Sequence, residues 1–150
     1  MKTIIYNADI ANEGRLTRGY IVIDDEIIAE VGEGEPAAAV MAECDVRNDV
    51  DGALVMPGVI DDQVHFRDPG LTHKADIATE SAAAVAGGVT SYMDMPNTVP
   101  PTVTIDALEA KNRRAQEVSV ANYGFFIGAT NDNLKTLMAV DYSYTTGVKL

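Results

Sequence analysis

The chain has 150 residues, and its 11 basic against 23 acidic residues give a formal charge of −12. With 47% hydrophobic residues it has the apolar content of a folded protein rather than of a disordered segment. An acidic surface repels phosphate groups, so neither nucleic-acid nor membrane partners are expected. Its one cysteine, Cys44, cannot form an internal disulfide, and the first residues lack an apolar signal segment, which favours the cytoplasm.

Residues 1–56 have the pattern of a small β-sheet. Three short runs rich in β-branched residues predict strands at Ile4–Tyr6, Tyr20–Ile23 and Ile27–Val31. The acidic residues Asp24–Glu26 are the expected hairpin connection between the last two. Residues 33–39 fit either a loop or one helical turn. A sheet this small needs a second layer over its apolar face, and C-terminal sequence beyond this chain could supply it.

From residue 57 onward, predicted strands and helices alternate. The strands are Val59–Phe66, Val89–Met95, Val120–Ile127 and a fourth that starts at Gly147. The helices run from a cap at Asp76 to Ala86, from a cap at Thr104 to Val118, and over residues 132–140. Connections of this length suit right-handed parallel crossovers. Residues 57–150 therefore predict the α/β class, as either a (β/α)8 barrel or a doubly wound sheet.

Four polar residues lie two positions apart along the first of these strands: Asp61, Gln63, His65 and Arg67. In an extended strand they share one face, opposite the residues between them. A histidine alone would be interpreted as a core residue, and an arginine alone as a surface charge. Four polar side chains in a row near the carboxyl end of a strand favour a functional site, because the active sites of barrels lie at that end.

Two further candidates belong to later predicted strands. Lys149 lies between Val148 and Leu150 and would point away from them, either as an ordinary edge-strand lysine or into the interior of a barrel. In a barrel its amine could react with carbon dioxide, and the resulting carbamate could bridge two divalent cations. Asn97 follows the strand that ends before Pro96, although an Asn-x-x-Pro sequence by itself also fits an ordinary turn.

The sequence from Met56 to Gly70, Met-Pro-Gly-Val-Ile-Asp-Asp-Gln-Val-His-Phe-Arg-Asp-Pro-Gly, resembles the opening motif of the cyclic amidohydrolases and, among them, that of the dihydroorotases. Residues 72–77 and Asp94–Thr98 extend the resemblance, which is continuous over about residues 54–102. Allantoinases and hydantoinases share the metal-strand pattern but usually lack the arginine together with the Pro-Asn-Thr loop. The resemblance implies a (β/α)8 barrel with a flanking β-sandwich. Residues 1–56 would form the N-terminal part of the β-sandwich, and residues 57–150 would supply the first four strands of the barrel.

The resemblance also implies a reaction and a set of residue roles. The reaction is the reversible cyclisation of N-carbamoyl-L-aspartate to dihydroorotate in de novo pyrimidine biosynthesis, with one or two Zn²⁺ ions as cofactor. His65 matches the second histidine of a His-x-His metal pair, and Lys149 matches the N6-carboxylated lysine that bridges the zinc ions. Arg67 and Asn97 match the residues that hold the substrate carboxylate. Asp61 would orient the metal ligands from behind.

One position departs from the pattern, because Gln63 stands where the first metal histidine is expected. An amide oxygen is a weaker zinc ligand than an imidazole nitrogen. Gln63 can be a weak metal ligand, the site can work with fewer ligands, or the protein can be an inactive scaffold for aspartate transcarbamoylase. We expect the active enzyme, because the other matched residues are all present. A related hydantoinase or allantoinase is a third hypothesis.

The partners and the completeness of the chain follow from the same resemblance. A small-molecule substrate is expected, and a homodimer or a complex with aspartate transcarbamoylase is allowed. The family's other metal histidines and its catalytic aspartate lie beyond residue 150, so no catalytic residue is expected here. The last residues look like the opening of a buried strand. The chain is therefore expected to be a fragment that alone neither folds stably nor turns over substrate.

Overall fold

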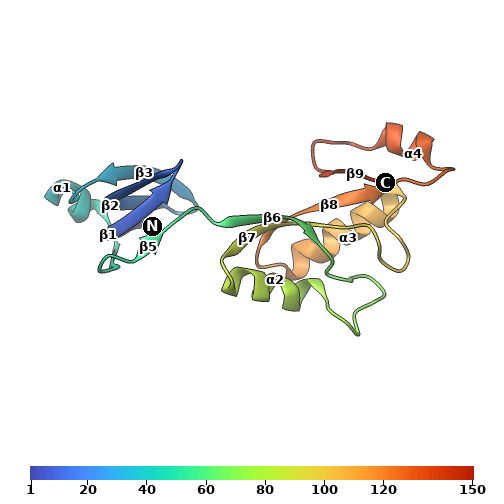
Figure 1. Cartoon of the computed structure of the whole chain (residues 1–150), viewed down its shortest axis with the longest axis horizontal. Helices are drawn as coiled ribbons and strands as arrows, with labels where there is room; N and C mark the ends of the chain where they lie inside the picture. The colour runs from blue at the N-terminus through green and yellow to red at the C-terminus, as the bar shows by residue number, and fades with distance from the viewer. The chain divides into compact units, whose positions relative to one another are not determined.

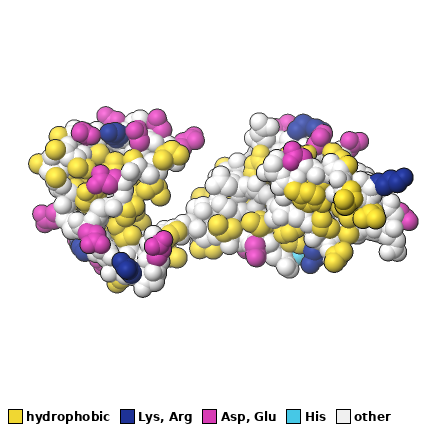
Figure 2. Space-filling view, turned by 90° about the horizontal axis from the view of Figure 1, so that it is seen from above, with side chains coloured by type: hydrophobic (Ala, Val, Ile, Leu, Met, Phe, Trp, Pro, Cys, Tyr) yellow, Lys and Arg dark blue, Asp and Glu magenta, His cyan; other side chains and the backbone are white.

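The computed structural model describes all residues, 1–150. It contains two compact units, Met1–Pro57 and Gly58–Leu150, each with its own sheet (Figure 1). Acidic side chains are spread over the face seen in Figure 2, with apolar side chains between them. None of the helices is long and apolar enough to cross a membrane.

The first unit is a five-stranded sheet with the order β3-β2-β1-β4, in which β5 also pairs with β1. Its elements are β1 (Lys2–Asn12), β2 (Arg15–Asp24), β3 (Ile27–Glu33), α1 (Ala38–Glu43), β4 (Val46–Asp49) and β5 (Leu54–Val55). The predicted hairpin between β2 and β3 is confirmed, and β1 and β2 are longer than predicted. Residues 33–39 combine both expectations, since a loop leads into α1 at Ala38.

Two strands of the first unit were not predicted. β4 and β5 run parallel to β1 and hold its outer edge. β4 consists of Val-Arg-Asn-Asp and β5 of only two residues, so neither has a run of β-branched residues. The neighbouring strand stabilises them, which a local pattern cannot reveal. Ile4, Tyr20 and Val22 pack with the buried Cys44 in the main apolar cluster of this unit.

The second unit is a parallel sheet whose strands follow each other in chain order, β6-β7-β8-β9. Its elements are β6 (Val59–Val64), α2 (Ile77–Ala86), β7 (Val89–Asp94), α3 (Ile105–Val118), β8 (Asn122–Gly128), α4 (Leu134–Ala139) and β9 (Gly147–Lys149). A doubly wound sheet reverses its strand order at a switch point, whereas this one does not. The sheet is the first half of a (β/α)8 arrangement, as predicted.

The ends of the two long helices follow from their sequences. Asp76 caps α2, and its carboxylate accepts a hydrogen bond from the Thr79 backbone N–H at 2.8 Å, which holds the pKa of Asp76 below its usual value. Thr104 caps α3 through a hydrogen bond of 3.2 Å from the Ala107 N–H. Both predictions are confirmed. The third helix is shorter than residues 132–140, because the Asn133 side chain binds loop carbonyls instead of the helix start.

One face of the parallel sheet is buried against the helices. Phe66, Tyr92, Phe125 and Ile127 from the strand side form a single cluster with Ile77 of α2 and with Leu108 and Ala115 of α3. The ring of Tyr92 lies 4.4 Å from that of Phe66 and 6.5 Å from that of Phe125, measured between centroids. Since side chains alternate along a strand, this cluster fixes which residues point to the opposite face.

Replacement of Phe125 by alanine tests the importance of this cluster. Phe125 is fully buried at its centre, so Phe125→Ala should lower the free energy of unfolding by about 3–5 kcal/mol. Urea unfolding of the protein that contains this chain measures the change. The matched control is Val120→Ala, at a site 65% exposed, which should be nearly neutral. Equal effects of the two substitutions would contradict the assignment of this core.

Candidate active site

The polar residues singled out in the sequence gather at the carboxyl ends of the parallel strands. Gln63 is the second-to-last residue of β6, His65 directly follows that strand, and Lys149 is the last residue of β9. Asn97 follows β7 after Pro96. This edge of the sheet is where barrel enzymes place their active sites.

Register and burial place three of these residues on the face away from the helices. Val148 pairs with Ile127, which is buried in the helix-side cluster, so Lys149 must point the other way. Val64 and Phe66 pack on the helix-side cluster. Alternation therefore turns Gln63 and His65 to the opposite face, and these two side chains and Lys149 are exposed.

The extended row of four polar residues does not persist to Arg67. We predicted a strand to Phe66, but β6 ends at Val64, and its register with β7 shifts between Asp61 and Val64. The Asp61 carboxylate accepts a hydrogen bond from the Gln63 backbone N–H at 3.1 Å, which stabilises this irregularity. Arg67 has a φ of +66° and lies in the loop that follows. Arg67 therefore belongs to a loop and not to the strand face.

The closest contact between predicted site residues joins His65 and Asn97. His65 Nδ1 lies 2.8 Å from Asn97 Oδ1, across 32 positions of sequence. An amide oxygen only accepts hydrogen bonds, so with the Asn97 amide in this orientation the ring carries its hydrogen on Nδ1. The neutral ring then offers the lone pair of Nε2, the arrangement common in metal-binding histidines. The Asn97 amide keeps its two N–H groups available for another partner.

The loops after β6 and β7 are joined by their backbones. The Val99 N–H donates a hydrogen bond of 3.1 Å to the carbonyl of Pro69. Gly70, with a φ of +83°, approaches the Val99 carbonyl so closely that a Cβ would lie 1.8 Å from its oxygen. Asp68 is buried and pairs with Arg114 of α3, with 3.2 Å between Oδ2 and Nε. The residues that follow Arg67 are thus held both by the loop after β7 and by α3.

Sequence reasoning missed the buried ion pair beneath these loops. Lys111 of α3 and Asp94 of β7 have side chains that are 0% and 1% exposed, with Nζ and Oδ2 2.6 Å apart. A signal for it exists in the sequence, because Leu108, Lys111 and Ala115 follow the helical period and place the lysine on the buried stripe of α3. The Arg67 guanidinium and the Lys149 ammonium, in contrast, form no ion pair.

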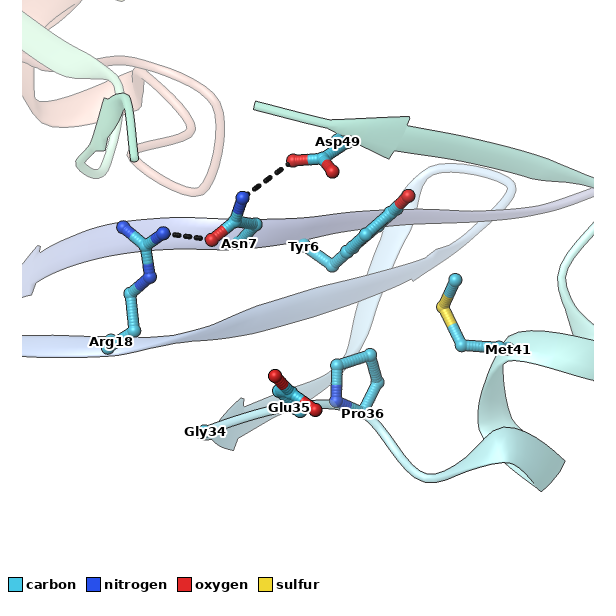
Figure 3. A pocket seen from close by; sticks show the side chains of 8 residues that line it. All are labelled: Tyr6, Asn7, Arg18, Gly34, Glu35, Pro36, Met41 and Asp49. Atoms are coloured by element: carbon cyan, nitrogen blue, oxygen red, sulfur yellow. Dashed lines mark hydrogen bonds between the residues drawn. The ribbon is translucent and has the colours of Figure 1, made fainter. Parts of the chain in front are cut away.

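A separate pocket lies on the first unit, with a volume of about 570 Å³ (Figure 3). Its Arg18 donates hydrogen bonds to Asn7 Oδ1 and, at 3.0 Å, to Asp9 Oδ1, while Asn7 donates to Asp49 at 2.9 Å. The side chains of Arg18, Asn7 and Asp49 are therefore already paired with their neighbours. It is a less suitable ligand site than the edge that carries His65 and Asn97.

A sequence comparison decides the family. The model of the family described as Dihydro-orotase-like matches residues 52–146, well over half of the chain. The chain belongs to this family. The match extends past the 54–102 segment of the motifs to include α3, β8 and α4, so the resemblance seen in the sequence is confirmed.

Individual members of the dihydro-orotase-like family agree with this assignment. The dihydroorotase of Lactobacillus acidophilus is 34% identical over 143 residues, which are 95% of this chain and 32% of that protein. The dihydroorotase of Methanothermobacter thermautotrophicus is 41% identical over 108 residues, 72% of this chain and 24% of that protein. The chain thus spans about a quarter to a third of the length of these curated relatives.

Solved structures show the same fold. The L-hydantoinase (dihydropyrimidinase) from Arthrobacter aurescens superposes with a TM-score of 0.83 at 28% identity, covering 97% of this chain and 32% of that one. A D-hydantoinase structure superposes with a TM-score of 0.80 at 23% identity and covers 100% of this chain and 33% of that one. This chain and these hydantoinase chains therefore share the fold described above.

The contact between His65 and Asn97 predicts a tautomer that can be observed directly. In metal-free protein at mildly alkaline pH, ¹⁵N-detected NMR should show the neutral His65 ring with its hydrogen on Nδ1. Asn97→Ala should shift the ring toward the Nε2–H form that predominates in free histidine. His73, in the same connection between β6 and α2, is the internal reference. A mixture of His65 tautomers that is the same in both proteins would contradict the contact.

Proposed function

We propose that this chain forms the first part of the active centre of a zinc-dependent dihydroorotase, which interconverts N-carbamoyl-L-aspartate and dihydroorotate in pyrimidine biosynthesis. The observation that carries the proposal is the contact between His65 and Asn97 at the carboxyl edge of the half-barrel, in a chain of the dihydro-orotase-like family. It joins a candidate metal ligand to a candidate substrate ligand. The sequence identities of 34% and 41% to dihydroorotases exceed the 28% to the hydantoinase structure.

The residues at this edge would supply part of the ligand set of a zinc ion. His65 has its Nδ1 occupied by Asn97, which leaves Nε2 oriented for a metal. Gln63 and Lys149 point to the same face, the first with an amide oxygen and the second with an amine that becomes a carboxylate ligand when N6-carboxylated. No group of three or more His, Cys, Asp or Glu side chains in this chain is arranged to hold a metal ion by itself. One or two zinc ions would therefore share these ligands with others.

Arg67 and Asn97 suit the substrate carboxylate. A guanidinium offers two parallel N–H donors that match the two oxygens of a carboxylate. The Arg67 side chain has no ionic partner of its own, and the Asn97 amide retains N–H donors after its oxygen has bound His65. Because Asn97 also contacts His65, the substrate carboxylate would be held next to a candidate metal ligand.

The chemistry divides between the metal and the chain. When bound, the zinc polarises the ring carbonyl and lowers the pKa of its water. The chain's own residues bind and orient: His65 and Lys149 hold the metal, and Arg67 with Asn97 fixes the carboxylate. The group that moves the proton is not among them, so the proposed catalytic aspartate belongs to a later strand. The substrate is a small molecule, and a homodimer or a transcarbamoylase complex remains part of the proposal.

Turnover of dihydroorotate, measured with added zinc and bicarbonate, tests the function in the protein that contains this chain. Turnover that is lost in His65→Ala, together with bound zinc, supports the proposal and shows that Gln63 is tolerated. Absence of both turnover and zinc in the unaltered protein would contradict it and favour the scaffold for aspartate transcarbamoylase. Preference for hydantoin or allantoin over dihydroorotate would identify the ring-opening relatives instead.

The two substrate ligands give a second prediction. Arg67→Ala should weaken binding of dihydroorotate by about 2–5 kcal/mol, seen as a higher KM with zinc content unchanged, because one partner of a charge pair is removed. Arg67→Lys should recover part of the loss, since it restores the charge without the two-pronged geometry. A KM that is unchanged in Arg67→Ala would remove this residue from the carboxylate site.

Lys149 gives a third prediction. Lys149→Ala should reduce zinc content and turnover together, because it removes the proposed bridging ligand. Lys149→Glu, which supplies a carboxylate without carbon dioxide, is the matched variant and should retain more zinc than alanine does. Zinc content equal to that of the parent protein in Lys149→Ala would place Lys149 outside the metal site.

A further inference from the structure

The buried ion pair between Lys111 and Asp94 lies directly under the two loops of the candidate site. Lys111 Nζ is 2.6 Å from Asp94 Oδ2, and the two side chains are 0% and 1% exposed. The ammonium also lies 4.9 Å from the centroid of the Phe125 ring. Within the apolar cluster that joins sheet and helices, this is a charged pair withdrawn from water.

An ion pair in such a place is costly to keep. Desolvation of two charges is offset only where the geometry is good and further hydrogen bonds are formed, and apolar residues of similar size often stabilise a fold as well. Burial lowers the pKa of Lys111, although the Asp94 charge opposes this shift. Packing of the core alone therefore does not account for a lysine at this position.

The polar contacts of the pair show what it holds. Asp94 Oδ1 accepts a hydrogen bond of 3.0 Å from the backbone N–H of Phe66, the residue between His65 and Arg67. Lys111 Nζ donates a hydrogen bond of 2.9 Å to the carbonyl of Met95, two positions before Asn97. One end of the pair thus fixes the loop after β6, and the other end fixes the loop after β7.

These contacts explain how His65 and Asn97 meet. The Phe66 N–H leaves the β-ladder and turns to Asp94, so the chain departs from the strand at the position of His65. The Met95 carbonyl is held by a helix side chain, which sets the path of the following Pro-Asn segment. Both loops are thus anchored to α3 through Lys111, directly or by way of Asp94. The 2.8 Å contact between His65 and Asn97 joins the two loops.

We propose that Lys111, acting through Asp94, is a positioning residue that holds the candidate metal ligand His65 and the candidate substrate ligand Asn97 in register. The inference rests on the proposed function for its consequences in catalysis, but its structural core concerns the geometry of the His65–Asn97 contact alone. Lys111 touches neither substrate nor metal. Its effect is transmitted by the backbones of Phe66 and Met95.

The test compares Lys111→Met with a matched core variant in the protein that contains this chain. Leu108→Ala is the control, because Leu108 is fully buried on the same stripe of α3 but makes none of these polar contacts. The first readout is the His65 tautomer in metal-free folded protein. Lys111→Met should lose the fixed Nδ1–H tautomer, whereas Leu108→Ala should keep it despite a lower melting temperature.

The second readout concerns zinc and substrate. Lys111→Met should weaken zinc binding or raise the KM for dihydroorotate by about tenfold or more, as loss of a residue that orients a ligand does. Leu108→Ala should change neither value per folded molecule. If the parent protein does not turn over dihydroorotate, the proposed function fails, but the tautomer measurement still decides the positioning role.

A double variant keeps the test decisive if Lys111→Met does not fold. Asp94→Leu combined with Lys111→Met removes both charges and leaves no unpaired buried ion, so it should fold. It should nevertheless lose the fixed His65 tautomer, because neither loop has its anchor. A folded single or double variant whose His65 tautomer and KM equal those of the parent overturns the proposal, as does an identical loss in Leu108→Ala.

Discussion

The apolar layer between the parallel sheet and its helices determines the orientation of every strand in the second unit. Once Phe66, Tyr92 and Phe125 point to the helices, the neighbours of each along its own segment must face the other way. The direction in which the Gln63 and His65 side chains point follows from this alternation. A shift of one residue would bury them and expose the aromatic rings, at a cost far larger than any single contact in the site.

Position along the strands is controlled by a different kind of interaction. Apolar packing is non-directional, so it sets which face a side chain occupies but does not fix a loop to within a fraction of an ångström. Directional bonds to Phe66 N and Met95 O supply that second level of control at the carboxyl ends. The apolar core therefore determines which face a side chain occupies, and the polar contacts determine the positions of the loops. This division explains why charged groups lie inside an otherwise apolar layer.

Local signals in the sequence were sufficient for some elements and not for others. The caps at Asp76 and Thr104 act within three residues, so α2 and α3 could be predicted at both ends. The end of β6 depends on Asp94, 28 positions away from Phe66, and was predicted too late. The motif identified His65 and Asn97 as candidates, but their contact follows from strand order. Lys111 lies within a correctly predicted helix, but its burial depends on Asp94 of β7, a partner that the helical period does not reveal.

The side chain of Asn133 has a consequence for how this family can change in length. Its oxygen accepts a hydrogen bond from Thr130 N at 2.8 Å, and its nitrogen donates to Val103 O at 3.0 Å and Gly128 O at 2.8 Å. The connections after β7 and β8 are thereby closed into a unit that leaves no slack for an added residue. An added residue in either connection would have to break at least one of these three hydrogen bonds. A change of length in one connection would therefore also disturb the other, because a single side chain binds both.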